Sequence, residues 1–209
     1  MSAFNKVTWL FFTLASVLIC AALHAQDQDD AADTARLIEV LAIREGSMVA
    51  DIGAGSLVLT LPIARHVGSS GHVFSTDINP QWLLEMRNAA EKAQLRNVTI
   101  IEGASTQTNL PNGCCDAVFM RHVYHHFGEP PLMNASLRAS LKPGGRLAVV
   151  DFAPRNGMSA AAGRRGTDVS HGVMSETVIE ELRAAGFVGV EQLPWPSRGY
   201  FLVVAQRPD

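Results

Sequence analysis

The stretch Met48-Val49-Ala50-Asp51-Ile52-Gly53-Ala54-Gly55-Ser56-Leu57 decides the fold of this chain. An apolar run that carries one acid leads into a Gly-x-Gly turn, and a run compatible with a helix follows from Val58 to His66. This order predicts a strand, a tight turn and a helix, the first βα unit of a nucleotide-binding α/β domain. The two glycines can adopt backbone angles closed to other residues and, without a Cβ, let a ligand approach the main chain. The helix after the turn offers that ligand unpaired N–H groups and a positive dipole end.

The composition favours one α/β domain without a nucleic-acid role. Of the 209 residues, 47% are hydrophobic and 18% are charged, proportions that suit a packed core. The formal net charge is -3, and the longest basic feature is Arg164-Arg165. Because nucleic-acid binding needs concentrated Lys and Arg against phosphate, we expect no nucleic-acid partner.

Residues 1–25 have the pattern of a targeting segment. Lys6 precedes an apolar run over residues 7–22, and Ala25 precedes a polar, acidic stretch. We expect a signal peptide cleaved after Ala25 or, because the run is nearly long enough to span a bilayer, an uncleaved N-terminal anchor. A lipoprotein cleavage before Cys20 and a buried helix of the fold are weaker alternatives. The favoured options place the domain in the periplasm or outside the cell, with membrane contact only if the segment stays uncleaved.

The rest of the chain alternates strand and helix patterns. Five β-then-α units followed by a β-hairpin predict a parallel sheet with helices on both faces and an antiparallel last pair. Pro62 requires the first helix after the glycine turn to start late or to kink. We expect strands at 49–52, 71–77, 97–103, 115–120, 146–152, 187–193 and 200–205; helices within 31–43, 58–66, 80–93, 129–141 and 176–185; a turn at 142–145; and a long loop at 153–175.

The cysteines and histidines predict neither a disulfide framework nor a metal site. Cys114 and Cys115 are adjacent, and the small ring that would join them strains a disulfide, so we expect them to stay unpaired. His122 and His126 stand four residues apart, but a strand of roughly 17 Å separates them from the cysteines.

Asp77 is the first residue outside the glycine turn that points to a ligand. It ends the second expected strand, 24 residues after Gly53. An acid near that offset can accept hydrogen bonds from the hydroxyls of an adenosine ribose.

The motifs together resemble those of class I S-adenosylmethionine-dependent methyltransferases. The resemblance covers about residues 31–206, and the segments at 124–127 and 171–172 are similar to a subgroup of small, often exported members. It implies a Rossmann-like seven-stranded sheet of order 3-2-1-4-5-7-6 with strand 7 antiparallel. The motifs that carry it are Val49–Gly55, Asp77, Asp116–Met120, Leu141–Arg146 and Val149–Asp151.

The resemblance implies S-adenosyl-L-methionine as cofactor and assigns residues to its parts. Leu57 and Ala104 depart from the family pattern, where a glycine and an acid are common, and we expect both changes to weaken cofactor binding. The implied contacts are Asp51, Gly53, Ala54 and Gly55 toward the methionine part, Asp77 at the ribose, Ile78 and Ala104 at the adenine, and Arg121 and His122 on the methionine side.

Candidate catalytic residues follow the fourth strand. Tyr124, His125 and His126 lie where ligands bind at the carboxyl edge of such sheets, and a neutral histidine there could take a substrate proton near pH 7. Asp151, which ends the fifth strand, is a second candidate for substrate contact. His171 in the long loop could close over a substrate, although an incidental histidine is the simpler interpretation.

We therefore expect an enzyme that transfers a methyl group from S-adenosylmethionine to a small molecule. The alternative is a non-catalytic module of the same fold that binds the cofactor or another small molecule. A nicotinamide dehydrogenase is disfavoured because Val58 stands where the third glycine of its fingerprint would be. Export from the cytoplasm, where S-adenosylmethionine is made, leaves the supply of cofactor as an open question.

Overall fold

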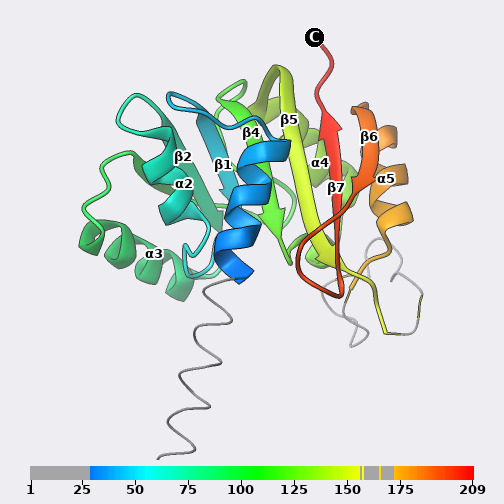
Figure 1. Cartoon of the computed structure of the whole chain (residues 1–209). Helices are drawn as coiled ribbons and strands as arrows, with labels where there is room; N and C mark the ends of the chain where they lie inside the picture. The colour runs from blue at the N-terminus through cyan, green and yellow to red at the C-terminus, as the bar shows by residue number, and fades with distance from the viewer. Residues whose placement is uncertain (1–28, 156, 158–164, 166–171) are drawn as a thin grey trace, which may run out of the picture.

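A computed structural model describes residues 29–155, 157, 165 and 172–209. Figure 1 shows a single central sheet with helices on both sides. The expected leader at residues 1–25, most of the long loop and His171 lie outside the described residues. Within the part of the chain that the structure describes, no helix is long and apolar enough to cross a membrane.

The sheet has seven strands in the order β3-β2-β1-β4-β5-β7-β6, which confirms the predicted topology. All neighbouring pairs from β3 to β5 are parallel, whereas β7 runs antiparallel to both β5 and β6. The strands are β1 (Met48–Ile52), β2 (His72–Asp77), β3 (Val98–Glu102), β4 (Cys115–Arg121), β5 (Leu141–Phe152), β6 (Val188–Leu193) and β7 (Tyr200–Gln206).

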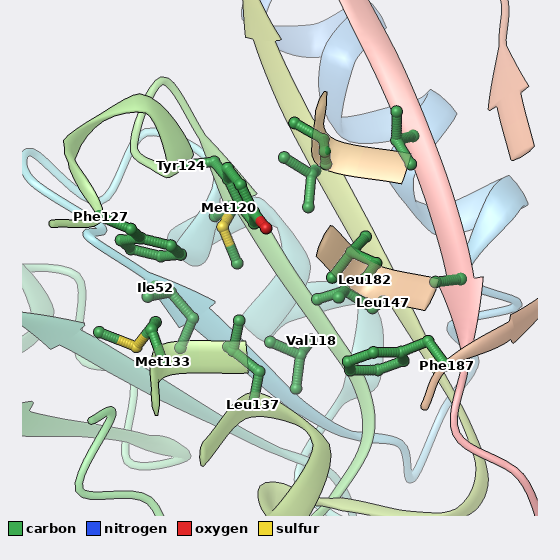
Figure 2. Close-up of a cluster of buried hydrophobic side chains, with 14 of the residues drawn as sticks. Ile52, Val118, Met120, Tyr124, Phe127, Met133, Leu137, Leu147, Leu182 and Phe187 are labelled. Carbon is green, nitrogen blue, oxygen red and sulfur yellow. The ribbon is translucent and has the colours of Figure 1, made fainter. Parts of the chain in front are cut away.

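Alternation along the central strands builds a core on each face of the sheet. In β4, Val118 and Met120 pack on one side, and Ala117 and Phe119 pack on the other. The first side is covered by helices α4 (Pro130–Ser140) and α5 (Ser175–Ala184), and Figure 2 shows part of this cluster. The second side is covered by the helix of residues 29–40 and by α2 (Thr60–Val67), with α3 (Pro80–Lys92) beside α2. Because side chains of a strand alternate between faces, an apolar run becomes two cores.

Two boundaries resolve what the sequence left open or placed wrongly. The helix after the glycine turn starts late, at Thr60, so Pro62 stands in its first turn, where proline is tolerated. The predicted turn at 142–145 is wrong, because these residues belong to β5. Gly144 has a φ of 71°, and the pairing register of β4 and β5 shifts between Cys115 and Ala117. The chain therefore bends within β5, at an irregularity of its ladder with β4, and not in a separate turn.

The expectation that the adjacent cysteines stay unpaired is also wrong. A disulfide joins Cys114 to Cys115 at the start of β4. In a regular strand, consecutive side chains point to opposite faces. Here Cys114 precedes the first ladder residue and the register shifts directly after Cys115, so the regular alternation does not hold at this point.

Candidate functional site

The candidate site lies at the edge where the parallel strands end. In the order β3-β2-β1-β4-β5, the direction of strand succession reverses between β1 and β4. Ligands of open α/β sheets bind at the carboxyl ends of the strands beside such a reversal. The residues after β1, β2, β4 and β5 meet at this edge, the lower one in Figure 1.

The glycine loop after β1 packs directly against the segment that follows β4. Gly53 has a φ of 68°, and a Cβ added there would lie 2.5 Å from a methyl carbon of Val123. Gly55 has a φ of 51°, but the place of its missing Cβ is open. Gly53 is therefore needed for close packing of two site segments, whereas Gly55 leaves room at the loop surface. The amide of Ala54 donates to the carbonyl of Thr76, 2.9 Å away, which fastens the loop to β2.

Asp77 joins the glycine loop to the end of β2. One carboxylate oxygen accepts from the Gly55 amide at 3.3 Å, and the other accepts from the Asn79 amide at 2.9 Å. Ile78 follows with 63% of its surface exposed, the largest fraction among the exposed large apolar side chains of the described residues. Ala104 is partly exposed after β3, and its amide donates to the carbonyl of Gln107. The predicted ribose and adenine residues therefore stand together along the ends of β2 and β3.

Asp51 belongs to a buried polar network beneath the loop. It is 4% exposed and accepts a hydrogen bond of 2.6 Å from the hydroxyl of Thr60, which lies 3.0 Å from the hydroxyl of Ser75. Burial raises the pKa of Asp51 to about 7, although the Thr60 hydrogen bond opposes the rise. This carboxyl thus links β1, β2 and the start of α2.

Leu57 occupies a left-handed backbone conformation with a φ of 63°. Such a φ is costly for a residue with a Cβ, and glycine is the residue that adopts it most readily. The side chain of Leu57 is fully buried and packs with Leu83, Met86 and Ala90 of α3. It therefore fills the space under α3.

Arg121, at the end of β4, is bound to the N-terminal helix. Its guanidinium lies 2.6 Å from a carboxylate oxygen of Asp30 and 2.8 Å from one of Asp33. The hydroxyl of Ser197, from the β6–β7 connection, donates to the other oxygen of Asp33. Nothing local in the sequence pairs residues that are about ninety positions apart, so this ion-pair cluster was not predicted.

His122 turns its ring toward β7. It has a φ of 61°, and its ring stacks on that of Tyr200 with centroids 4.4 Å apart. Burial, followed by the charge of Arg121, lowers the pKa of His122, so its imidazole is neutral at pH 7.

Tyr124 is fully buried beneath the site. Its hydroxyl donates to Glu181 at 3.0 Å and accepts from the side-chain amide of Asn134 at 2.7 Å. Arg165 pairs with both oxygens of Glu181 at 2.6 and 2.8 Å. Burial, followed by the charge of Glu181, raises the pKa of Tyr124, so the phenol stays protonated. Its contacts tie the segment after β4 to α4 and α5.

His125 and Asp151 form a buried pair. The Nδ1 atom of His125 lies 2.8 Å from Oδ1 of Asp151, and the His125 amide donates to Oδ2 at 3.0 Å. The amide of Phe152 also donates to Asp151, which is fully buried. His126 is exposed, and its ring centroid lies 3.9 Å from that of His125. The structure thus brings two predicted candidates, His125 and Asp151, into direct contact.

The fold and this edge define a class of protein. Residues 50–149 match the family model described as "Methyltransferase domain", a span that includes the glycine loop, Asp77 and the segment after β4. A SAM-dependent methyltransferase from Aquifex aeolicus superposes with a TM-score of 0.72 at 22% identity, covering 85% of this chain and 91% of that one. The chain therefore has the Rossmann-like fold of the methyltransferases.

Two further proteins are similar to this chain, one in sequence and one in fold. The ubiquinone/menaquinone biosynthesis C-methyltransferase UbiE of Teredinibacter turnerae is 32% identical over 123 residues, 58% of this chain and 49% of the relative. The chain spans about half the length of the relatives it matches in sequence. The [4+2]-cyclase SpnF has the same fold, with a TM-score of 0.70 at 18% identity over 84% of this chain and 80% of that one.

Proposed function

We propose that the chain is an S-adenosylmethionine-dependent methyltransferase acting on a small molecule. The match of residues 50–149 to the methyltransferase domain supports the class. The observation that carries the proposal is the link between the Gly55 amide and Asp77, beside the exposed Ile78, at the reversal between β1 and β4. A nucleoside needs such an arrangement, because its ribose offers hydroxyl donors and its base offers an apolar face.

The residues present fit that cofactor. Each carboxylate oxygen of Asp77 accepts one backbone amide and retains a lone pair for a ribose hydroxyl. The open place beside Gly55 lets a ligand approach the loop backbone, and Ile78 offers an apolar surface for adenine. When bound, the cofactor supplies a methyl group on a sulfonium, which carries its own leaving group. The protein's part is then to position the acceptor, exclude water and take a proton where the acceptor carries one.

Calorimetric titration of the purified chain with S-adenosylmethionine tests this function. We expect saturable binding that Ile78→Ser weakens about tenfold, because the variant loses apolar contact area. Val188→Ser is the matched control, since Val188 is 47% exposed at the start of β6, opposite Gln206 at the far end of β7, and should leave the affinity unchanged. Absence of binding at about 1 mM cofactor would refute the proposal. Binding without methyl transfer across a broad acceptor panel would instead favour the non-catalytic module.

We also propose that the domain works outside the cytoplasm. The apolar run at residues 7–22, with Lys6 before it, supports export, and the disulfide of Cys114 and Cys115 is typical of an oxidising compartment. Cell fractionation with mass spectrometry of the N-terminus tests this. A mature chain that starts at Gln26 outside the cytoplasm is expected, whereas an intact N-terminus in the cytoplasm contradicts export.

A further inference from the structure

Five rings form a continuous row along the site edge. The order is His126, His125, Phe152, His122 and Tyr200, and each ring centroid lies within 5.9 Å of the next. The row joins the segment after β4 to the end of β5 and the start of β7. All of these residues except His125 keep part of their surface exposed, and Tyr200 keeps 39%. The sequence pattern pointed to the three histidines, whereas it indicated Phe152 and Tyr200 only as strand residues.

The row starts beside the proposed cofactor loop. Val123, which separates His122 from Tyr124, is the residue that a Cβ on Gly53 would strike. From there the rings lead across β5 toward β7, away from Asp77 and Ile78 on β2. The row thus lies at the ends of β4 and β5 and the start of β7, beside the residues proposed to hold the nucleoside. A methyl acceptor has to bind on this side, next to the cofactor.

The chemistry of the row suits a planar, uncharged aromatic molecule. Aromatic rings pair with one another in stacked and edge-on arrangements, both of which occur within the row. A cationic acceptor would also be attracted to ring faces, but it needs a carboxylate to balance its charge when desolvated. Among the described residues, Asp33 and Asp151 are acids whose charges act on His122. In the described structure Asp33 is paired with Arg121, and Asp151 is held by His125 and two backbone amides.

The buried pair of His125 and Asp151 adds a requirement for an acidic hydroxyl. A carboxylate that accepts from Nδ1–H fixes the tautomer in which the lone pair of the imidazole is on Nε2. Two backbone amides donate to Asp151, and one of them, the His125 amide, fixes the ring relative to that carboxylate. Asp151 is thus a positioning residue, and His125 is the group that can accept a proton.

We propose that the methyl acceptor is a hydroxylated aromatic compound, a phenol, seated against Phe152, His122 and Tyr200 with its hydroxyl at His125. The inference rests on the proposed methyltransferase function. In the reaction the aryl oxygen forms a bond to the methyl carbon while the carbon–sulfur bond of the sulfonium donor breaks. That electron pair stays on sulfur, and the hydroxyl proton passes to Nε2 of His125 and then to water. The products are an aryl methyl ether and a neutral thioether.

Binding of 2-naphthol without any methyl donor tests the acceptor site independently of the cofactor. Titration of the intact chain, followed by naphthol fluorescence, should show saturable binding that Tyr200→Leu weakens at least about fivefold. Trp82→Leu is the matched control, because Trp82 is also 39% exposed but lies on α3. Equal losses in the two variants, a loss only in Trp82→Leu, or stronger binding of tetramethylammonium than of 2-naphthol would overturn the inference.

Turnover with S-adenosylmethionine then tests the proton transfer. Asp151→Asn and His125→Asn should each lower kcat for 2-naphthol by about a hundredfold with little change in KM. A nitrated naphthol, whose hydroxyl ionises without a base, should recover most of this loss. Equal losses for both acceptors would show that the pair is only structural and would overturn its role. If wild-type chain binds 2-naphthol at Tyr200 but binds no S-adenosylmethionine, the acceptor site stands and the proposed methyltransferase function fails.

Discussion

The backbone strain at Leu57 leads to a quantitative prediction. Truncation of a fully buried leucine to alanine costs about 3 kcal/mol of unfolding free energy, because apolar contacts are lost and a cavity remains. At most positions a further change to glycine costs about 1 to 2 kcal/mol more, through chain entropy and one more buried methyl group. At Leu57, with its φ of 63°, glycine relieves about 1 to 2 kcal/mol of left-handed strain. The Ala and Gly variants at this position should therefore be about equally stable.

Leu83 provides the matched comparison. Leu83 is 3% exposed, belongs to the same buried cluster as Leu57 and is itself a residue of helix α3. Leu83→Gly should therefore be less stable than Leu83→Ala by the ordinary 1 to 2 kcal/mol, about the sum of helix propensity and methyl burial. Urea unfolding of the four variants at one pH measures both differences. A Gly-to-Ala difference of the same size at both positions would refute the claim of strain at Leu57.

The same variants test what Leu57 means for cofactor binding. The sequence suggested that a leucine in this loop weakens binding, but the side chain packs against α3. We therefore expect Leu57→Gly to change the calorimetric affinity for S-adenosylmethionine by less than about threefold once the fraction of folded protein is accounted for. A tenfold or larger gain would show that the leucine obstructs the site.

Three further predictions concern the same region of the chain. The raised pKa of Asp51, about 7 against an ordinary value of 3.8, means that the fold favours its neutral form; this contribution to stability is full below about pH 4 and is lost as the pH rises to about 7. Asp51→Asn should hence gain stability relative to wild type between about pH 4 and pH 8, up to roughly 4 kcal/mol, and a constant difference in urea unfolding across that range would contradict the assignment. Gly53→Ala should destabilise the fold by about 2 kcal/mol or more and weaken cofactor binding, because its Cβ would lie 2.5 Å from Val123; thermal unfolding and calorimetry check both. Non-reducing mass spectrometry of the mature chain should find Cys114 and Cys115 in one peptide that is two hydrogens lighter than its reduced form, and two free thiols would contradict the disulfide.

The fold could be predicted from local sequence patterns because each pattern has a local physical cause. The alternation of apolar residues and the glycine turn predict each βα unit, and the handedness of parallel crossovers limits how such units assemble. Asp77 and His125 were placed at one edge for the same reason, since parallel strands end together. The misplaced turn at 142–145 shows the limit of this reasoning. A lysine, a proline and two glycines have a turn composition, but the flanking Leu141 and Arg146 pair with β4, and the two glycines exchange backbone hydrogen bonds with Arg207 beyond β7.

The partners of the site residues could not be predicted in the same way. Arg121 is bound by Asp30 and Asp33, and Tyr124 by Glu181, across long separations in sequence. Such choices depend on how helices from distant segments pack against a strand end, which no spacing in the chain encodes. The contact of His125 with Asp151 was easier to foresee, because the two residues follow or end β4 and β5, which are neighbours in the predicted strand order.

The reversed last strand has a practical consequence for handling this protein. Because β7 runs against its neighbours, it starts at the candidate site and carries the end of the chain to the opposite edge of the sheet, as Figure 1 shows. There the backbone of Arg207 exchanges hydrogen bonds with Gly144 and Gly145. The helix of residues 29–40, in contrast, begins beside Arg121. An affinity tag or surface linker attached after Asp209 therefore leaves the ring row and glycine loop accessible, whereas one fused just before Asp30 sits at their border.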